Sequence, residues 1–376
     1  MLFKDVLGQA GTKKILTDAI NIGRVPHAQL LVGKEGQGGL ALALAWSQML
    51  VCENRQAQDS CGKCVACQKA AKAIHPDIHY TFPTISKGDG KPSVSNDFLK
   101  QWREAIAENP YQNSNQWLQK LDAENKQGNI TKDECVKIVS KLSLKAFEAP
   151  YKILILWLPE YLGKEGNRLL KLIEEPPDDT YFMLVTQNEE LILNTIISRC
   201  QSLLLQPLAD ADIINALIAE HDLAMAQAEN IAYIVDGNYN EALSLVHQTD
   251  DDLAPLLMDW ISVCINTLRK NDGIKMVQWS EKAAAWGREQ QKYFFRFALQ
   301  FLRECLLLKV APQQKSRISE QHRERAVKFA DYLTIPQIDQ MTTLFNESYY
   351  HIERHANAKI LWLDASLQIK NLFKLT

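Results

Sequence analysis

A glycine-rich turn at residues 33–40 constrains the fold of this chain more than any other feature of its sequence. The turn reads Gly-Lys-Glu-Gly-Gln-Gly-Gly-Leu, follows an apolar run at residues 28–32 and leads into a helical pattern that continues to Leu50. A strand, a glycine-rich turn and a helix, in this order, are the setting of a phosphate-binding loop, G-x-x-x-x-G-K-[ST]. The sequence therefore predicts the fold of a nucleotide-binding protein around this turn.

The turn keeps the glycines of such a loop but not its phosphate-handling side chains. Gly33 and Gly38 have the required spacing, with Gly36 between them, whereas Gly39 and Leu40 stand where the lysine and the Ser/Thr are expected. In a working loop the lysine offsets phosphate charge and the hydroxyl holds magnesium. We therefore expect a degenerate loop that neither hydrolyses ATP nor binds it tightly.

The acidic residues that would hold magnesium are predicted to be missing at the end of the apolar run 153–156. An Asp-Glu pair is normally the second magnesium-holding element at such a strand end, and this chain has Trp157 and Leu158 there. Glu160 follows three places too late, and we expect it to be solvated. Two independent losses are harder to explain as accident than one.

Apolar runs alternate with helical segments over residues 1–206, which predicts a doubly wound α/β domain with a parallel sheet. A helix is expected to begin after Thr131, with Glu134 completing a capping box. From about residue 208 only helical patterns remain, so the expected fold class is α/β followed by all-α. The expected strands are 29–32, 78–82, 151–157, 181–186 and 202–205.

Residues 84–130 are predicted to be an insertion with small helices of its own. Its first part, 86–96, has the composition of a loop, and helical patterns follow at 98–108 and 115–124. Trp102 can stack on a nucleobase in principle, but a role as a hydrophobic anchor of the insertion is favoured. The sequence assigns no function to the insertion.

Four of the eight cysteines cluster in the pattern C-x8-C-x2-C-x2-C, formed by Cys52, Cys61, Cys64 and Cys67. In a reducing compartment such a cluster indicates metal ligands rather than disulfides. Four thiolates match the closed tetrahedral site of one structural Zn²⁺. The other four cysteines are expected to be ordinary core or half-buried residues: Cys135, Cys200, Cys264 and Cys305.

The amino-acid composition argues against some classes of protein. The chain has 376 residues, of which 46% are hydrophobic and 23% charged, and a formal net charge of -3. This balance disfavours a protein that binds nucleic acid alone through a strong basic field. No apolar run reaches about 18 residues, and there is no signal-peptide pattern, so we expect no membrane span and a cytoplasmic location.

Several motifs occur in an order that points to a known family. They are Gly8-Gln9, Val25-Pro26-His27-Ala28, the glycine turn, the four cysteines, Leu169-Leu170-Lys171 with Glu174-Glu175-Pro176-Pro177, and Ser198-Arg199-Cys200. In this combination the chain resembles the clamp-loader branch of the AAA+ family, and within it the delta-prime class of bacterial DNA polymerase III subunits. The resemblance covers roughly residues 1–245 well and the remainder more weakly.

The resemblance implies three domains. These are an AAA+ base domain at 1–207, with the cysteine module 52–67 and the insertion 84–130, a helical lid at 208–248 and a helical collar for oligomerisation at 249–376. Family members use ATP to load a sliding clamp onto primed DNA within the DNA polymerase III holoenzyme. The implied partners are the motor subunits and the clamp-opening subunit of a heteropentamer, with the clamp and DNA reached through the complex.

The resemblance also assigns a role to one arginine. Arg199, between Ser198 and Cys200, matches the arginine finger that reaches into the ATP site of a neighbouring motor subunit. Asn240 stands where a motor subunit carries its nucleotide-sensing arginine. The resemblance therefore implies a static subunit that has no intrinsic ATPase activity and supplies Arg199 in trans.

Two other functions remain open at this point. The chain can be an ATP-hydrolysing motor subunit of the same complex, although Gly39 and Leu40 disfavour that reading. It can also be a stand-alone zinc-containing protein that binds nucleic acid, which the net charge of -3 and the closed cysteine site disfavour. Hydrolysis by the isolated chain would support the first, and salt-sensitive DNA binding would support the second.

Overall fold

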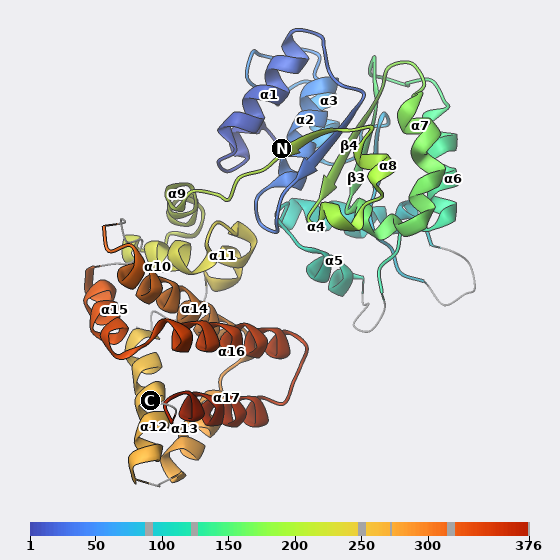
Figure 1. The fold of residues 1–376 in the computed structure, drawn as a ribbon. Helices are drawn as coiled ribbons and strands as arrows, with labels where there is room; N and C mark the ends of the chain where they lie inside the picture. Colours follow the sequence, from blue (N-terminus) through green and yellow to red (C-terminus); the bar gives the residue numbers. More distant parts are fainter. Residues whose placement is uncertain (87–92, 122–126, 247–252, 271–272, 314–319, 375–376) are drawn as a thin grey trace. The chain divides into compact units, whose positions relative to one another are not determined.

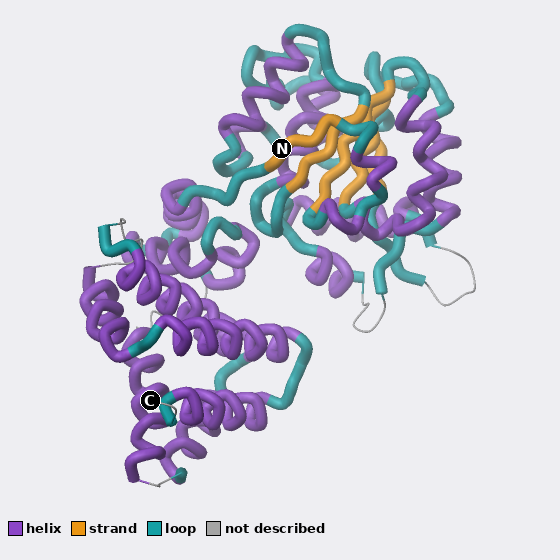
Figure 2. The backbone as a smooth tube through the Cα atoms, viewed as in Figure 1, coloured by secondary structure: helices purple, strands orange, loops and turns teal. Residues whose placement is uncertain are grey.

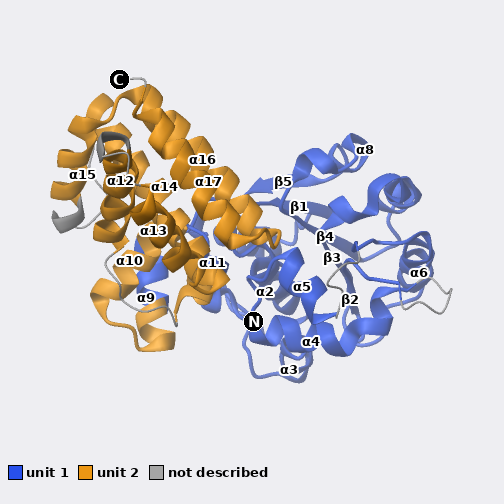
Figure 3. Ribbon diagram, turned by 90° about the horizontal axis from the view of Figure 1, so that it is seen from below, with its two compact units in different colours: residues 1–216, 237–241 blue, residues 217–236, 242–376 orange. Residues whose placement is uncertain are grey.

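The described residues of this chain form two compact units. The computed structural model describes residues 1–86, 93–121, 127–246, 253–270, 273–313 and 320–374. The first unit comprises residues 1–216 with 237–241, and the second comprises 217–236 with 242–376 (Figure 3). The division into a base, a lid and a collar stays a prediction.

A five-stranded sheet with the strand order β2-β3-β4-β1-β5 lies at the centre of the first unit (Figure 1). Each strand runs parallel to its neighbours, so the predicted parallel sheet is confirmed. Every residue of β1 and β3 is buried, which explains why these strands are apolar in the sequence apart from Gln29 and Lys152. The strands are β1 (Ala28–Val32), β2 (Ile78–Thr81), β3 (Lys152–Trp157), β4 (Thr180–Thr186) and β5 (Gln201–Leu204).

Helices cover both faces of the sheet (Figure 1). α1 (Ala10–Asn21) and α2 (Gly39–Val51) lie on one face. On the other face Ile138 of α6 (Lys132–Leu142) belongs to one apolar cluster with Leu154 of β3 and Phe182 of β4. The remaining helices of this unit are η1 (Phe3–Asp5), α3 (Val65–Ala71), η2 (Ser95–Phe98), α4 (Leu99–Glu108), α5 (Ser114–Lys120), η3 (Pro159–Leu169), α7 (Leu170–Glu174), η4 (Glu189–Leu191) and α8 (Asn194–Ile197).

The insertion contains the two helices expected from its sequence, α4 and α5, which confirms that part of the prediction. Residues 87–92 of the expected loop, and residues 122–126, lie outside the described residues. Trp102 of α4 is 0% exposed and its ring stacks on Phe82 at a centroid distance of 4.3 Å. Trp102 is therefore a hydrophobic anchor that no nucleobase can reach.

The capping box expected at Thr131 is only half correct. The Thr131 hydroxyl accepts a hydrogen bond from the backbone N–H of Glu134 at 3.3 Å. The Glu134 carboxylate does not return to Thr131. It accepts instead from the Thr81 hydroxyl at 2.9 Å and from the N–H of Ser95 at 2.8 Å. Glu134 thus fastens the insertion to the end of β2.

The second unit is built from helices, and the described strands all belong to the first unit (Figure 2). An aromatic core holds it together: Trp260 and Trp362 meet at a ring distance of 5.0 Å, and the Trp260 Nε1–H donates to the Ser366 hydroxyl at 2.8 Å. Among the described residues no helix combines the length and apolarity that a membrane crossing requires. Helices α9 (Asp210–His221) and α11 (Tyr239–Leu245) each have residues in both units. The helices of the second unit are α10 (Met225–Val235), α12 (Leu253–Lys270), α13 (Ile274–Ala284), α14 (Arg288–Val310), α15 (Glu320–Tyr332), α16 (Ile335–Glu353) and α17 (Ala358–Leu372).

Candidate functional site

The glycine turn links β1 to α2 at the carboxyl end of the sheet, where ligands bind in α/β proteins. Gly36 and Gly38 have φ angles of +73° and +87°, which side-chain-bearing residues rarely adopt. A Cβ atom on Gly36 would lie 1.9 Å from the Asn238 side chain. Leu40 is 3% exposed, so its side chain packs into the core. The turn has the shape of a phosphate-binding loop without room for further side chains.

Part of the turn is closed by its own glutamine. The Gln37 side chain is 6% exposed, and its Oε1 accepts a hydrogen bond from the N–H of Lys34 at 2.8 Å. The Gln37 carbonyl oxygen accepts from Gln9 Nε2 at 3.1 Å. The Gln37 side-chain oxygen thus accepts from the N–H of Lys34. In a functional loop, backbone N–H groups of the turn bind phosphate oxygens instead.

Glu35 joins the turn to Asn240. One carboxylate oxygen, Oε1, accepts from Asn240 Nδ2 at 2.8 Å and from Asn113 Nδ2 at 2.9 Å. Asn240 is 2% exposed, and its Oδ1 accepts from Asn109 Nδ2 at 2.7 Å. Asn240, which is matched by sequence to the sensing position, is therefore a buried neutral amide that is bonded to an acid.

The strand end that should hold magnesium is apolar. Trp157 and Leu158 are each 1% exposed, and neither carries an oxygen ligand in its side chain. The expectation that Glu160 is solvated is wrong: its carboxylate accepts from the Thr186 hydroxyl at 3.0 Å and from the Gln187 N–H at 3.1 Å. Leu158, with a φ of +59°, turns the chain back so that Glu160 reaches β4. Burial raises the pKa of the Glu160 carboxyl, although these hydrogen bonds oppose the shift.

Arg199 follows the short helix α8 and keeps its guanidinium at the surface. Its Nε and Nη2 donate to Glu174 Oε2 at 3.0 and 2.8 Å, and its Nη1 donates to the Thr195 carbonyl oxygen at 2.9 Å. A guanidinium has five N–H donors, so two remain without a partner among the described residues. The arginine side chain keeps 30% of its exposure and the glutamate 56%. Ser198 is exposed and Cys200 is half-buried beside it.

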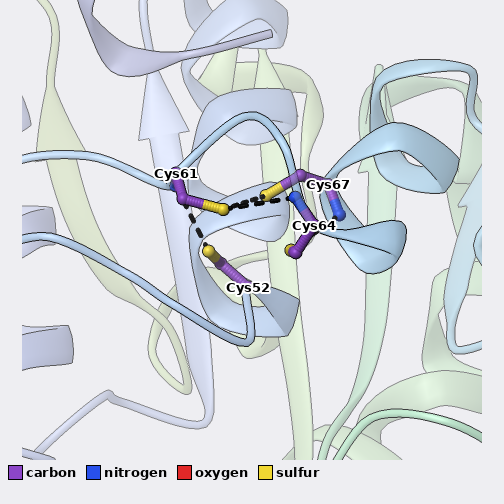
Figure 4. A group of neighbouring side chains, drawn as sticks. All are labelled: Cys52, Cys61, Cys64 and Cys67. Carbon is purple, nitrogen blue, oxygen red and sulfur yellow. Dashed lines mark hydrogen bonds between the residues drawn. The ribbon is translucent and has the colours of Figure 1, made fainter.

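The four clustered cysteines come together between α2 and α3 (Figure 4). The sulfur atoms of Cys52, Cys61, Cys64 and Cys67 all lie within 4.8 Å of one another, and those of Cys61 and Cys67 are 3.9 Å apart. A tetrahedron of sulfurs about 2.3 Å from a metal has S–S distances of nearly 4 Å. The cluster is therefore able to bind one metal ion.

Backbone donors around the cluster suit negatively charged sulfur. The N–H of Cys61 donates to Cys52 Sγ at 3.3 Å, and those of Cys64 and Cys67 donate to Cys61 Sγ and Cys64 Sγ at 3.4 Å each. N–H donors from Lys63 and Cys64 lower the pKa of the Cys61 thiol to about 6. Burial raises the pKa of the Cys67 thiol in the absence of a metal charge. The remaining cysteines are buried or half-buried as expected: Cys135, Cys200, Cys264 and Cys305.

The sequence did not identify Glu35, Asn109, Tyr111 and Asn113 as members of the site. The Tyr111 ring lies 3.0 Å from the point where a Cβ on Gly38 would stand. Of these residues, only Glu35 could have been found from the sequence. A carboxylate in a phosphate-binding turn is a signal because it repels a phosphate. The asparagines of the insertion carry no local pattern that points to the turn.

Comparison with known proteins identifies the family. A family model described as "DNA polymerase III, delta subunit" matches residues 8–209. DNA polymerase III subunit delta' of Bacillus subtilis (strain 168) is 29% identical over 63% of this chain and 59% of its own. Subunit gamma of Buchnera aphidicola subsp. Acyrthosiphon pisum (strain APS) is 26% identical over 65% of this chain and 57% of its own.

Both alignments leave more than a third of each relative uncovered. Among solved structures, a gamma subunit-related protein from Thermotoga maritima aligns over 96% of this chain and all of its own, with 13% identity. The TM-score of this alignment is 0.39. The family model covers more than half of the sequence, and the chain belongs to the DNA polymerase III delta subunit family.

Proposed function

We propose that this chain is a clamp-loader subunit that does not hydrolyse ATP and that supplies Arg199 to the ATP site of a neighbouring subunit. The observation that carries the proposal is the closed turn: Glu35 and Gln37 form hydrogen bonds within it, and Leu40, whose side chain is buried, stands where a magnesium-binding hydroxyl would be needed. Relatives named delta' and gamma both match the chain, so the assignment to the static class depends on these residues.

Electrostatics supports the loss of nucleotide binding. Two unit negative charges about 4 Å apart repel by about 4 kcal/mol at an effective dielectric constant near 20. Among the described residues Glu35 has two amide donors and no ion-pair partner. A triphosphate at the turn would meet this charge without the lysine and the metal that normally offset its own.

Arg199 supports the second half of the proposal. It lies just after the short helix α8, with two N–H groups unused among the described residues. A guanidinium of this kind stabilises the charge that develops on a transferred phosphate. In this proposal the neighbours are motor and clamp-opening subunits of a five-membered complex. That complex loads a sliding clamp onto primed DNA.

We also assign the metal centre as one structural Zn²⁺ held by Cys52, Cys61, Cys64 and Cys67. Four sulfur ligands leave no open position for chemistry. The metal would instead join the end of α2 to the start of α3, because Cys52 follows α2 directly and Cys64 caps α3. Its role is to stabilise the helix that begins in the glycine turn.

The test is reconstitution of the full chain with motor and clamp-opening subunits, followed by native mass spectrometry. We expect one copy of this chain per complex and one zinc per copy. We also expect no ATP hydrolysis by the chain alone. Hydrolysis by the isolated chain would favour the motor-subunit alternative, and failure to enter any complex would contradict the proposal.

A further inference from the structure

The short connection between α4 and α5, residues 109–113 of the insertion, contacts the glycine turn and its neighbour Asn240 at three points. Asn113 donates to Glu35, and Asn109 donates to Asn240. Between them the Tyr111 ring covers Gly38. In a functional phosphate-binding loop the backbone N–H groups of this part of the turn face the phosphates. The insertion therefore lies over the surface that a nucleotide would use.

Tyr111 is tied to its position from two further sides. The N–H of Leu7 donates to the Tyr111 hydroxyl oxygen at 2.8 Å. The ring meets Tyr239 edge-on at a centroid distance of 5.0 Å, and the N–H of Tyr239 donates to the Gly36 carbonyl oxygen at 3.3 Å. Tyr111 is 7% exposed. The ring thus connects the N-terminal segment, the turn and residues 237–241.

The connection is rigid for reasons internal to the insertion. The N–H of Tyr111 donates to Asn109 Oδ1 at 2.8 Å. Asn113 caps α5 by accepting from the N–H of Gln116 at 2.8 Å, and Gln116 Oε1 accepts from the N–H of Asn113 at 3.0 Å. The Trp117 Nε1–H donates to the Pro83 carbonyl oxygen at 2.7 Å and is fully buried. The three contacting side chains are therefore held in place before any ligand arrives.

We propose that residues 109–113 are a built-in occupant of the nucleotide position, which blocks triphosphate binding and fastens residues 237–241 to the turn. Nucleotide is then excluded in two ways: the turn lacks the lysine and the hydroxyl, and residues 109–113 cover it while Asn113 bonds to the turn's own acid, Glu35. This inference deepens the proposed function, because it explains how nucleotide is excluded, but it is tested without any partner subunit. A failure of the arginine finger would leave it untouched.

The first test restores the missing side chains. The variant Gly39→Lys/Leu40→Thr in the full chain should still fail to bind fluorescent mant-ATP with Mg²⁺. Adding Glu35→Ala and Tyr111→Ala to the same chain removes the acid and the ring, and mant-ATP should then bind at least about tenfold more tightly. Equal binding by the two variants, whether measurable or absent in both, would overturn the claim of a plug.

The second test leaves the turn unchanged. Asn113→Asp keeps the oxygen that caps α5 but replaces the donor to Glu35 by a like charge. Asn115→Asp makes the same change two residues further on, at an exposed position without a described side-chain bond.

Hydrogen–deuterium exchange should become at least about tenfold faster at residues 33–40 and 237–241 in Asn113→Asp. It should stay unchanged at residues 194–204, which carry Arg199. The same exchange rates in Asn113→Asp and Asn115→Asp would show that residue 113 does not fasten these segments.

Discussion

The glycine turn and the Arg199 corner, residues 194–204, belong to the same sheet domain. Their polar side chains are bonded in different ways. In the turn, the polar side chains bond to one another: Glu35 to two asparagines and Gln37 to the backbone. At the corner, Arg199 uses three donors locally and keeps its guanidinium at the surface. In the proposed function, the first region is a closed anion site and the second supplies a cationic group to another site. The difference teaches how, under this proposal, one scaffold can close its own site and still carry a group for another one.

Removal of the metal should have the largest effect on stability. This effect should be confined to the helices next to the glycine turn, α2 and α3. Structural Zn²⁺ contributes apparent binding energies of about 10–16 kcal/mol in small domains. The double variant Cys61→Ser/Cys64→Ser should drop from one bound zinc to none by native mass spectrometry, and exchange should accelerate in α2 and α3. Residues 194–204 should keep their protection.

Cys200→Ser is the matched control, because Cys200 lies outside the cluster and should leave the zinc content unchanged. If the double variant kept its zinc, or if exchange rose equally around Arg199, the metal would not belong to the region of the turn.

Loss of the insertion's anchor should come next. Trp102→Ala removes a fully buried ring and should lower the free energy of unfolding of the first unit by about 3–5 kcal/mol. Protection of residues 33–40 from hydrogen exchange should fall with it, because the insertion covers the turn. Trp102→Phe keeps most of the packing and should lose less, in urea unfolding followed by exchange. An equal cost for both variants would mean that ring volume at this site is unimportant.

A Glu174 variant tests the Arg199 region of the comparison. Glu174→Ala removes the carboxylate that orients the guanidinium, and we expect the ATPase rate of the assembled complex to fall by up to about tenfold. Stability should change by under about 1 kcal/mol, since the pair is exposed. Glu175→Ala is the control, an exposed neighbour of the same type. No difference between the two variants would make the Glu174 contact incidental.

The smallest effect concerns pH and Glu160. Because burial raises the folded-state pKa above the ordinary value of 4.5, folding favours the protonated form, and stability is lost as pH rises through the folded pKa. The Gln side chain of Glu160→Gln does not titrate. The stability of this variant relative to the native chain should therefore increase as pH rises from 4.5 through the folded-state pKa of Glu160, and then level off. We expect a gain of under about 1 kcal/mol near pH 7. Thermal unfolding measured from pH 4 to pH 8 would show it, and a constant difference would contradict the assigned shift.

The fold could be read from the sequence where local pattern determines structure. Buried parallel strands are continuous apolar runs, so β3 was placed to within one residue. The loss of Lys and Ser/Thr at Gly39 and Leu40 also depends on local spacing alone. Glu134 and Glu160 were misjudged because each carboxylate bonds to residues brought near by the fold, Thr81 and Thr186 respectively.

The plug could not be predicted from the sequence for the same physical reason. Asn113 and Glu35 are 78 positions apart, and Asn240 and Glu35 are 205 apart. A hydrogen bond between a common amide and a common acid leaves no periodic or spaced trace at such distances. The metal ligands, by contrast, lie within 16 residues of sequence from Cys52 to Cys67, and the cluster was found directly.

The most direct test of the account is the ATPase rate of the reconstituted complex that contains Arg199→Ala. Arg168→Ala is the matched control, because Arg168 is also exposed and also paired with a glutamate, Glu165, at 2.7 Å. The account predicts that Arg199→Ala assembles normally and lowers the rate at the ATP site beside this chain by on the order of 10³-fold or more, while Arg168→Ala does not. An assembled complex with Arg199→Ala that hydrolyses ATP at the native rate would contradict the account.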